Sequence, residues 1–302
     1  MSVQRNWGAG VFGVTFGGVN CGIVQSVKLS QTKRPVSEAP VSHGLFTQRA
    51  MGNKELTPIE LEVALSGGRM EVLNRFKAIF DQKTDNGGGA ARFDGAIMVG
   101  NVDGNCVQMQ NFYNGLVTSF AFGDVDVGAK AAPTFKITIE PEKIETLDGD
   151  NSKIQGAVDK GNKEWLASNF RVTAAGLTTT HVTKVYGFTT KCTTSKQYIG
   201  EQDLPELIPG NFEFPKDGKI DFMGKTAKDW YAWHKQMVID GDNMAEKDIV
   251  VEYLDTTLKK TLFTVTYHEC GISDLATPQF TNNESKSALN TATLYCDRIS
   301  FA

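Results

Sequence analysis

The sequence lacks the patterns that most often mark a metal site, a disulfide framework or a membrane segment. Its five cysteines are widely scattered and none belongs to a Cys-x-x-Cys pair, which excludes the usual zinc and thioredoxin-like motifs. An odd number of cysteines without regular spacing indicates free thiols in a reducing compartment. No stretch approaches the roughly 18 apolar residues of a membrane-spanning helix, and the first residues show no signal-peptide pattern. We therefore expect the protein to be made in the cytoplasm.

A large excess of either charge is also missing. The chain of 302 residues carries 31 Lys and Arg against 35 Asp and Glu, a net charge of −4. Attraction to nucleic acid or to an anionic membrane is therefore not expected. The hydrophobic fraction of 40% is ordinary for a globular protein, and the length leaves room for about two domains.

One short cluster has the residue types of a metal or nucleophile site. His268, Glu269 and Cys270 are consecutive, and on a strand His268 and Cys270 would share one face while Glu269 points the other way. A zinc site needs about four converging ligands, and no second His-Cys grouping exists. We interpret the cluster as ordinary strand residues.

Two acidic pairs and one glycine run resemble binding motifs only in part. Asp124 with Asp126, and Asp148 with Asp150, lack EF-hand spacing and are interpreted as solvated loop residues. Asn-Gly-Gly-Gly at 86–89 follows a predicted helix and lacks the Gly-Lys-Ser/Thr ending of a phosphate-binding loop. No Gly-x-Ser-x-Gly motif is present. We expect no catalytic residue, no cofactor and no metal site, and predict that the protein is not an enzyme.

The chain does contain one plan used twice. Each half has a single predicted amphipathic helix, at residues 69–81 and 226–238. The helices are expected to pack on their sheets through apolar residues at helical spacing, which are Leu73, Phe76, Phe80, Trp230 and Trp233.

The spacing of the strands after each helix also matches. From the first strand to the closing strand the separation is 42 positions in both halves, from Phe93 to Phe135 and from Ile249 to Thr291. Matched spacing with little residue identity indicates a duplication, so repeats decide the fold prediction here. We predict a mainly β (α+β) protein with a first module at 1–147, a linker at 148–164 and a second module at 165–302.

Local patterns place the main strands and loops. Ile59–Leu65 alternate between apolar and polar residues and form the clearest strand. Residues 31–55 are predicted as a long polar loop or loose hairpin with its own hydrophobic tip, and residues 204–214 as a Pro-rich loop. Asp103-Gly104 and residues 255–260 are predicted hairpin turns. Separate short strands are predicted at 115–122 and 271–276.

Several of these segments resemble the tail-tube proteins of contractile phage tails and related injection systems. The first module opens with Phe16-Gly-Gly-Val-Asn-Cys-Gly-Ile-Val-Gln-Ser-Val-Lys-Leu29 and continues to the strand at Ile59–Leu65. The second helix carries Asp229-Trp230, and the closing segments Phe135–Ile144 and Thr291–Phe301 are also similar to that family. The resemblance covers most of the chain, but ordinary tube subunits resemble one half only.

The resemblance implies two tandem tail-tube-like β-sandwich or barrel modules, each with one packed helix, in a hollow ring. Polar residues alternating on the strands are then expected to line the lumen, namely Lys28, Glu60 and Glu62. A loop in the first module is expected either to contact the next ring, through His43, Leu45, Phe46 and Arg49, or to fold back on its own module. Which module lines the lumen is left open.

The implied function is structural: stacked rings form a passive conduit for DNA or effectors that are not bound specifically. The implied partners are further copies of the chain and sheath, baseplate and tail-terminator proteins, and the implied location is a virion tail or injection apparatus. One alternative is a baseplate hub or tube-end ring in which three chains imitate a six-fold ring. An alternative of another class is a soluble carbohydrate-binding module that uses exposed aromatic residues such as Trp230, Tyr231 and Trp233.

Overall fold

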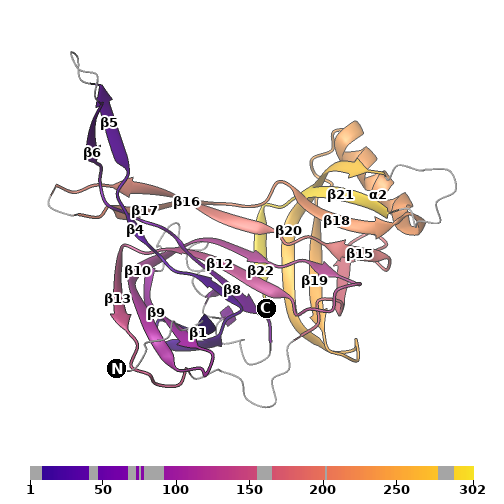
Figure 1. The fold of residues 1–302 in the computed structure, drawn as a ribbon. Helices are drawn as coiled ribbons and strands as arrows, with labels where there is room; N and C mark the ends of the chain where they lie inside the picture. Colours follow the sequence, from indigo (N-terminus) through magenta and orange to yellow (C-terminus); the bar gives the residue numbers. More distant parts are fainter. Residues whose placement is uncertain are drawn as a thin grey trace.

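The computed structural model describes residues 9–40, 47–66, 73–74, 76–77, 92–154, 165–200, 203–277 and 289–302. The fold is mostly β, as the sequence predicted, and its sheets include a nearly closed barrel (Figure 1). No helix within the described part of the chain is both long and apolar enough to cross a membrane.

The first sheet is built mainly from the first half of the chain. Its path contains seven strands, all neighbours being antiparallel, in the order β2 (Val19–Ile23), β1 (Ala9–Phe16), β9 (Arg92–Asn101), β10 (Cys106–Phe122), β12 (Thr134–Glu140), β8 (Ile59–Ala64) and β3 (Ser26–Lys28). β13 (Lys143–Asp148) pairs with the first part of β10, so β12 and β13 together follow one edge of that long strand.

The second sheet repeats this arrangement. Its order is β14 (Phe170–Ala174), β19 (Lys247–Leu254), β20 (Thr261–Ala276), β21 (Leu289–Tyr295), β18 (Gly218–Met223), β15 (Val182–Val185) and β11 (Val125–Asp126), and β22 (Arg298–Phe301) pairs with the first part of β20. The order β1-β9-β10-β12-β8-β3 therefore recurs as β14-β19-β20-β21-β18-β15. Two tandem modules with one plan account for both sheets.

Each module also sends out a hairpin between equivalent strands (Figure 1). We call the hairpin between β3 and β8 the first arm; it contains β4 (Thr32–Lys33), β5 (Val36–Pro40), β6 (Thr47–Met51) and β7 (Glu55–Leu56). The hairpin between β15 and β18 is the second arm, made of β16 (Thr189–Gln197) and β17 (Glu206–Glu213).

Three sequence predictions about these segments need correction. Residues 204–214 were predicted as a loop but contain β17; Pro209 is tolerated there because β17 pairs on one side only, with β16, among the described residues. The short strands predicted at 115–122 and 271–276 are the ends of the continuous strands β10 and β20. A change of partner along one long strand gives no signal in the sequence of that strand alone.

The place where each long strand changes partner carries the same bulge. Asn114 and Glu269 both have φ 51°, which is unusual for residues other than glycine. The N–H of Asn114 donates to Asp94 Oδ1 at 2.9 Å, and the N–H of Glu269 donates to Asp248 Oδ1 at 3.0 Å. An aspartate on the preceding strand therefore holds each bulge in place.

The second bulge also corrects the interpretation of residues 268–270. His268 and Cys270 do not share a face, because Glu269 interrupts the alternation: Tyr267 and Cys270 are both buried and His268 is half-buried. The His268 ring instead lies 3.1 Å from Asp248 Oδ2 through Nδ1 and 2.7 Å from Ser300 Oγ through Nε2.

The helices cover the sheets with aromatic side chains. In the second module α2 (Ala227–His234) follows a 3-10 turn at Gly224–Thr226 and continues into a π-helical turn at Lys235–Ile239. In the first module the described helical residues are 73–74 and 76–77, and the Phe76 ring lies edge-on to Phe16 at 5.4 Å and to Phe135 at 5.7 Å.

Part of the predicted linker at 148–164 is fixed against the first sheet. The N–H of Cys106 donates to the carbonyl of Ser152 at 2.8 Å, Asn105 forms a β-bridge with Lys153, and Ile154 is buried. These contacts extend the pairing beyond β13 along the turn between β9 and β10. Residues 155–164 lie outside the described residues.

We expect the five thiols to be unreactive in the folded protein, because all five cysteines are buried. Burial also raises the pKa of Cys106 and Cys270, and it raises the pKa of Cys296 to about 12, so little thiolate forms at these sites at pH 8. Ellman's reagent at pH 8 should detect almost no thiol in the native protein and five after denaturation. Rapid reaction of the native protein would contradict this packing.

The Asp248 contact should make stability depend on pH. The hydrogen bond from the Glu269 N–H lowers the pKa of Asp248, so its stabilisation is present above the pKa of the unfolded chain and is lost as the pH falls through the folded value. Asp248→Ala should lower the free energy of unfolding by about 0.5–1 kcal/mol at pH 7, the low end for a half-exposed carboxylate. In urea titrations this difference should shrink below about pH 4. Asp103→Ala, at the exposed β9–β10 turn, serves as control and should change little.

Candidate assembly interface

The second arm joins the second module to the first. β16 starts beside β10 and pairs with it in the register Ser119–Lys191, Phe120–Thr190 and Ala121–Thr189. The first sheet therefore continues into a strand from the second half of the chain, and β17 adds one more strand beyond it. In Figure 1 the second arm runs from the second sheet across to the base of the first arm.

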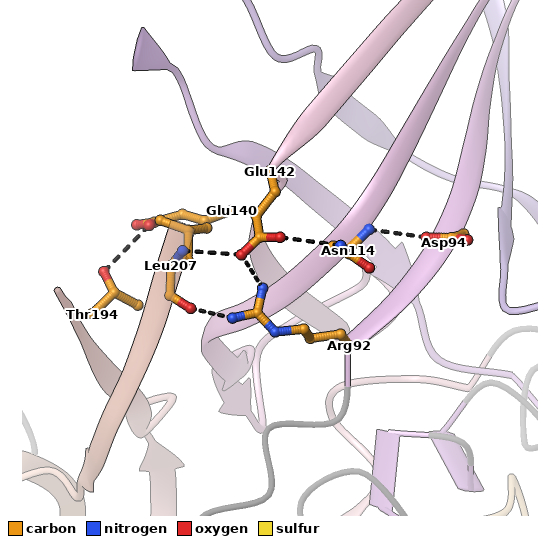
Figure 2. A network of polar contacts seen from close by, with 7 residues as sticks. All are labelled: Arg92, Asp94, Asn114, Glu140, Glu142, Thr194 and Leu207. Carbon is orange, nitrogen blue, oxygen red and sulfur yellow. Dashed lines mark hydrogen bonds and ion pairs between the residues drawn. The ribbon is translucent and has the colours of Figure 1, made fainter. Parts of the chain in front are cut away.

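A polar network holds the second arm on the first module (Figure 2). Glu142, between β12 and β13, accepts a hydrogen bond from the Leu207 N–H at 2.9 Å, while Arg92 donates to the Leu207 carbonyl. Arg92 also forms an ion pair with Glu142. Both backbone polar groups of Leu207 in β17 are thus bound by two paired side chains, Arg92 and Glu142, which are only 28% and 17% exposed. Charge-assisted bonds of this kind are stronger than neutral ones.

Neighbouring residues complete this network. Asn114 Nδ2 donates to the second oxygen of Glu142 at 3.1 Å, which ties the network to the bulge held by Asp94. Thr194 Oγ1, on β16, donates to Glu140 Oε2 at 3.2 Å. The arm is therefore fixed along both of its strands.

Aromatic rings join the two cores under the arm. Phe120 lies 6.3 Å from Phe301, and Phe122 lies 5.5 Å from Phe301 and 5.6 Å from Phe263 between ring centroids. All four side chains are buried. Apolar burial of this extent is the largest favourable term in joining two surfaces, so the two modules pack as one body.

The tip of the second arm meets the base of the first arm. Asp203 lies 3.8 Å from Lys54 Nζ and 4.0 Å from Arg34. These ion pairs are exposed and contribute little stability. At the root of the first arm the buried amide of Gln110 accepts from the Ser30 N–H at 3.0 Å and donates to its carbonyl at 2.9 Å. The base of the first arm is therefore fixed, while the rest of it extends away from the sheets (Figure 1).

Of the four predicted ring-stacking residues, the structure describes only Arg49. His43, Leu45 and Phe46 lie outside the described residues. Arg49 is on β6, where its side chain is exposed and forms a 2.7 Å ion pair with Glu38 on β5. Their role in stacking stays a prediction.

The predicted lumen residues form a ladder of charges on the exposed side of β3, β8 and β12. Lys28 lies 2.5 Å from Glu60, and Lys136 lies 3.5 Å from Glu62. The intervening residue Leu61 is buried, as the alternation predicted. Which space this face borders in an assembly stays a prediction.

The predicted helix-packing residues that the structure describes are all buried. Leu73 and Phe76 are 2% and 5% exposed, and Phe80 lies outside the described residues. Trp230 stacks on Phe222 at 4.6 Å. The ring N–H of Trp230 donates to Thr178, and that of Trp233 donates to Ala245. Neither tryptophan offers a face to a ligand.

No group of three or more His, Cys, Asp or Glu side chains within the described ranges could hold a metal ion. A surface hollow of about 680 Å³ lies at the root of the second arm, between residues 186–191 and 213–219. Its charged lining residues are three lysines and two acids, without a histidine or cysteine, so it offers no recognisable nucleophile with its base.

Sequence reasoning missed the residues that join the modules. Nothing in the local sequence of Arg92 or Glu142 distinguishes them from surface charges. A signal did exist for the arms: Thr32-Lys33 begins the first arm and Thr190-Lys191 begins the second. The dipeptide also occurs at Thr183-Lys184 on β15, so it identifies the arms as equivalent only together with the strand pairing.

Removing the Arg92 side chain should loosen the second arm. Arg92→Ala leaves Glu142 and the Leu207 carbonyl without their charged donor, and we expect a loss of about 2 kcal/mol in the free energy of unfolding. Hydrogen exchange should rise in β16 and β17 more than in β19. Arg171→Ala removes a more exposed pair with Glu252 and should cost about 0.5 kcal/mol, without a change in the arm. Equal exchange in both variants would contradict the role of Arg92.

Comparisons with solved structures find chains that match just under half of this one, at low sequence identity. No protein-family model and no curated protein matches. A chain of the anti-feeding prophage baseplate is 14% identical with a TM-score of 0.39, covering 49% of this chain and 98% of that one. A chain from the sheath/tube terminator of the extracellular contractile injection system PVC is 18% identical with a TM-score of 0.41, covering 48% and 99%. Hcp1 from Flavobacterium johnsoniae is 14% identical with a TM-score of 0.27, covering 44% and 94%.

Proposed function

We propose that this chain is a structural, non-enzymatic subunit of a ring in a phage-type tail or contractile injection system. The observation that carries the proposal is the continuation of the first sheet into the second arm, at Ser119–Ala121 and Thr189–Lys191. Two modules of one plan are joined edge to edge through backbone hydrogen bonds. Such a junction joins two different surfaces head to tail. When it is repeated from copy to copy, it therefore produces a closed ring or an open fibre.

The internal junction favours a ring made of three chains over one made of six. Each chain already contains one module-to-module junction, so both modules belong in the wall of the same ring. Six modules then require three chains, which is the arrangement of a hub or tube-end ring. A tube ring of six chains would instead place one module of each chain outside the wall, which the shared sheet and the joined aromatic core do not favour.

In this proposal the ring acts as a passive conduit. The charged ladder of Lys28, Glu60 and Glu62 borders the lumen, where alternating charges already paired on the surface give passing DNA or effectors no strong binding site. The partners are further copies of the chain and the sheath, baseplate and terminator proteins of the same apparatus. The place of action is the virion tail or injection apparatus.

A carbohydrate-binding module remains the alternative of another class, but the structure does not support the observation on which it was based. That alternative required exposed aromatic side chains, whereas Trp230 and Trp233 are 0% and 2% exposed and use their ring N–H groups internally. Tyr231 is partly exposed but its hydroxyl hydrogen-bonds Asn290.

The test is the size and shape of the assembled protein. We expect mass photometry and negative-stain electron microscopy of the purified chain to show hollow rings with pseudo-six-fold symmetry and three chains per ring. Six chains per ring would replace the hub form with the tube form. A chain that stays monomeric at every concentration and is retained on an oligosaccharide column would overturn the proposal in favour of the binding module.

A further inference from the structure

The two arms are equivalent to the level of single residues. β3 pairs Val27 with Leu61, and β15 pairs Val185 with Ile220. Beyond these strands, Lys33 pairs with Glu55 in the first arm and Lys191 pairs with Glu213 in the second. Both pairs join a lysine to a glutamate 22 positions later. Thr32 and Lys33 therefore correspond to Thr190 and Lys191, the residues by which the second arm binds β10.

The strand edges of β10 and β20 are equivalent too. In the first module Leu116 pairs with Glu140, and in the second Gly271 pairs with Tyr295. Each residue of the second pair lies 155 positions after its counterpart in the first pair, and the bulge residues Asn114 and Glu269 are also 155 positions apart. Applying that offset to Ser119, Phe120 and Ala121 gives Asp274, Leu275 and Ala276.

These equivalent positions differ in whether another strand pairs with them. Phe120 is buried beneath the second arm, at 5% exposed. Asp274 and Ala276 are exposed and Leu275 is half-buried, and among the described residues β20 has only β21 as a strand partner over 274–276. On the arm side, residues 31–33 are all exposed and β4 pairs only with β7 in the same described set. Within the described ranges, each chain therefore has two strand edges without a partner and of matching register: the outer edge of β4 and the edge of β20 at 274–276.

The charges at the two free elements are complementary. Where the internal junction places Lys191 opposite Ser119, the same register places Lys33 of one copy opposite Asp274 of another. Opposite charges facing each other across antiparallel strands are favourable, and like charges are not. Thr32 would face Leu275 as Thr190 faces Phe120.

We propose that Gln31–Lys33 of one copy of this chain adds as an antiparallel strand to Asp274–Ala276 of a second copy, in the register Lys33–Asp274, Thr32–Leu275 and Gln31–Ala276. This inference rests on the proposed ring-forming function and names the contact that closes the ring. The occupant of the free edge is a second copy, because the chain already contains that occupant at the equivalent edge. Each ring then alternates an internal junction with one between chains.

Disulfide trapping tests the register. Isotope-labelled Lys33→Cys protein is mixed with unlabelled Asp274→Cys protein and oxidised mildly, and the linked peptides are identified by mass spectrometry. Directly opposed residues on paired strands have the Cα separation that a disulfide needs. The five native cysteines do not interfere because they are buried. We expect a disulfide between positions 33 and 274 that joins a labelled chain to an unlabelled one.

Two matched controls define the outcome. Ser119→Cys with Lys191→Cys in one chain reproduces the same pair at the internal junction and should link within the chain. Lys33→Cys mixed with Leu275→Cys is shifted by one residue, so the side chains face opposite ways and linkage should fall at least about 10-fold. Equal linkage at 274 and 275 would overturn the register.

A charge swap tests the same contact without cysteines. Asp274→Lys should weaken ring association about 5-fold, since it places two lysines opposite each other. The double variant Lys33→Asp with Asp274→Lys should recover part of it, because every junction then contains the reversed pair while the new carboxylate at position 33 faces Glu55 in its own arm. Association is measured by mass photometry as a function of concentration, with Asp103→Lys as a surface control that should leave it unchanged.

Failure of this inference is distinguishable from failure of the proposed function. Rings of wild-type protein together with no linkage between 33 and 274 would overturn the inference and leave the ring-forming function standing. No rings and no linkage, with the internal Ser119–Lys191 control formed, would overturn both.

Discussion

An unpaired strand edge is the constraint on which the rest of this structure depends. Backbone N–H and C=O groups at the edge of a sheet must be paired, covered or left to water, and an exposed edge invites association with any other strand. The first sheet meets this constraint inside the chain, because β16 covers the edge of β10 over Ser119–Ala121. That one pairing places the second arm beside the first sheet. It also goes together with the position of the second module and with the joined aromatic core. The second sheet has the same edge at Asp274–Ala276, and no strand in the described part of the chain covers it.

The two kinds of contact at the internal junction have different roles. Phe120, Phe122, Phe263 and Phe301 bury apolar surface, which supplies most of the favourable free energy but fixes no register. Arg92 and Glu142 bind the backbone N–H and C=O of Leu207, so they hold β17 at one particular residue. Apolar packing therefore holds the modules together, while the ion pair determines how they align.

The sequence predicted the features that have a local period or a matched spacing. The alternation at Ile59–Leu65 identified β8, the helical spacing around Trp230 identified α2, and the equal distances in the two halves indicated the repeated plan. It did not reveal that β10 and β20 each change partner midway, because the change depends on a bulge held by an aspartate on another strand. β17 was missed because Pro209 suggests a loop, and only its place at an edge makes that proline acceptable. The junction residues were beyond local reasoning, since Arg92 and Leu207 are 115 positions apart.

In the proposed ring, the covalent link between the modules changes the thermodynamics of assembly. The internal junction forms at the effective concentration set by the chain itself, so its translational and rotational entropy is lost once, during folding, and not at each association step. Half of the junctions in a ring are then independent of protein concentration. Because of the link, the two junctions need not be identical. Ser119 at one edge is equivalent to Asp274 at the other, and a mutation at one junction leaves the other unchanged. A ring of this kind presents two alternating surfaces to whatever binds its rim, which a ring of identical single modules cannot do.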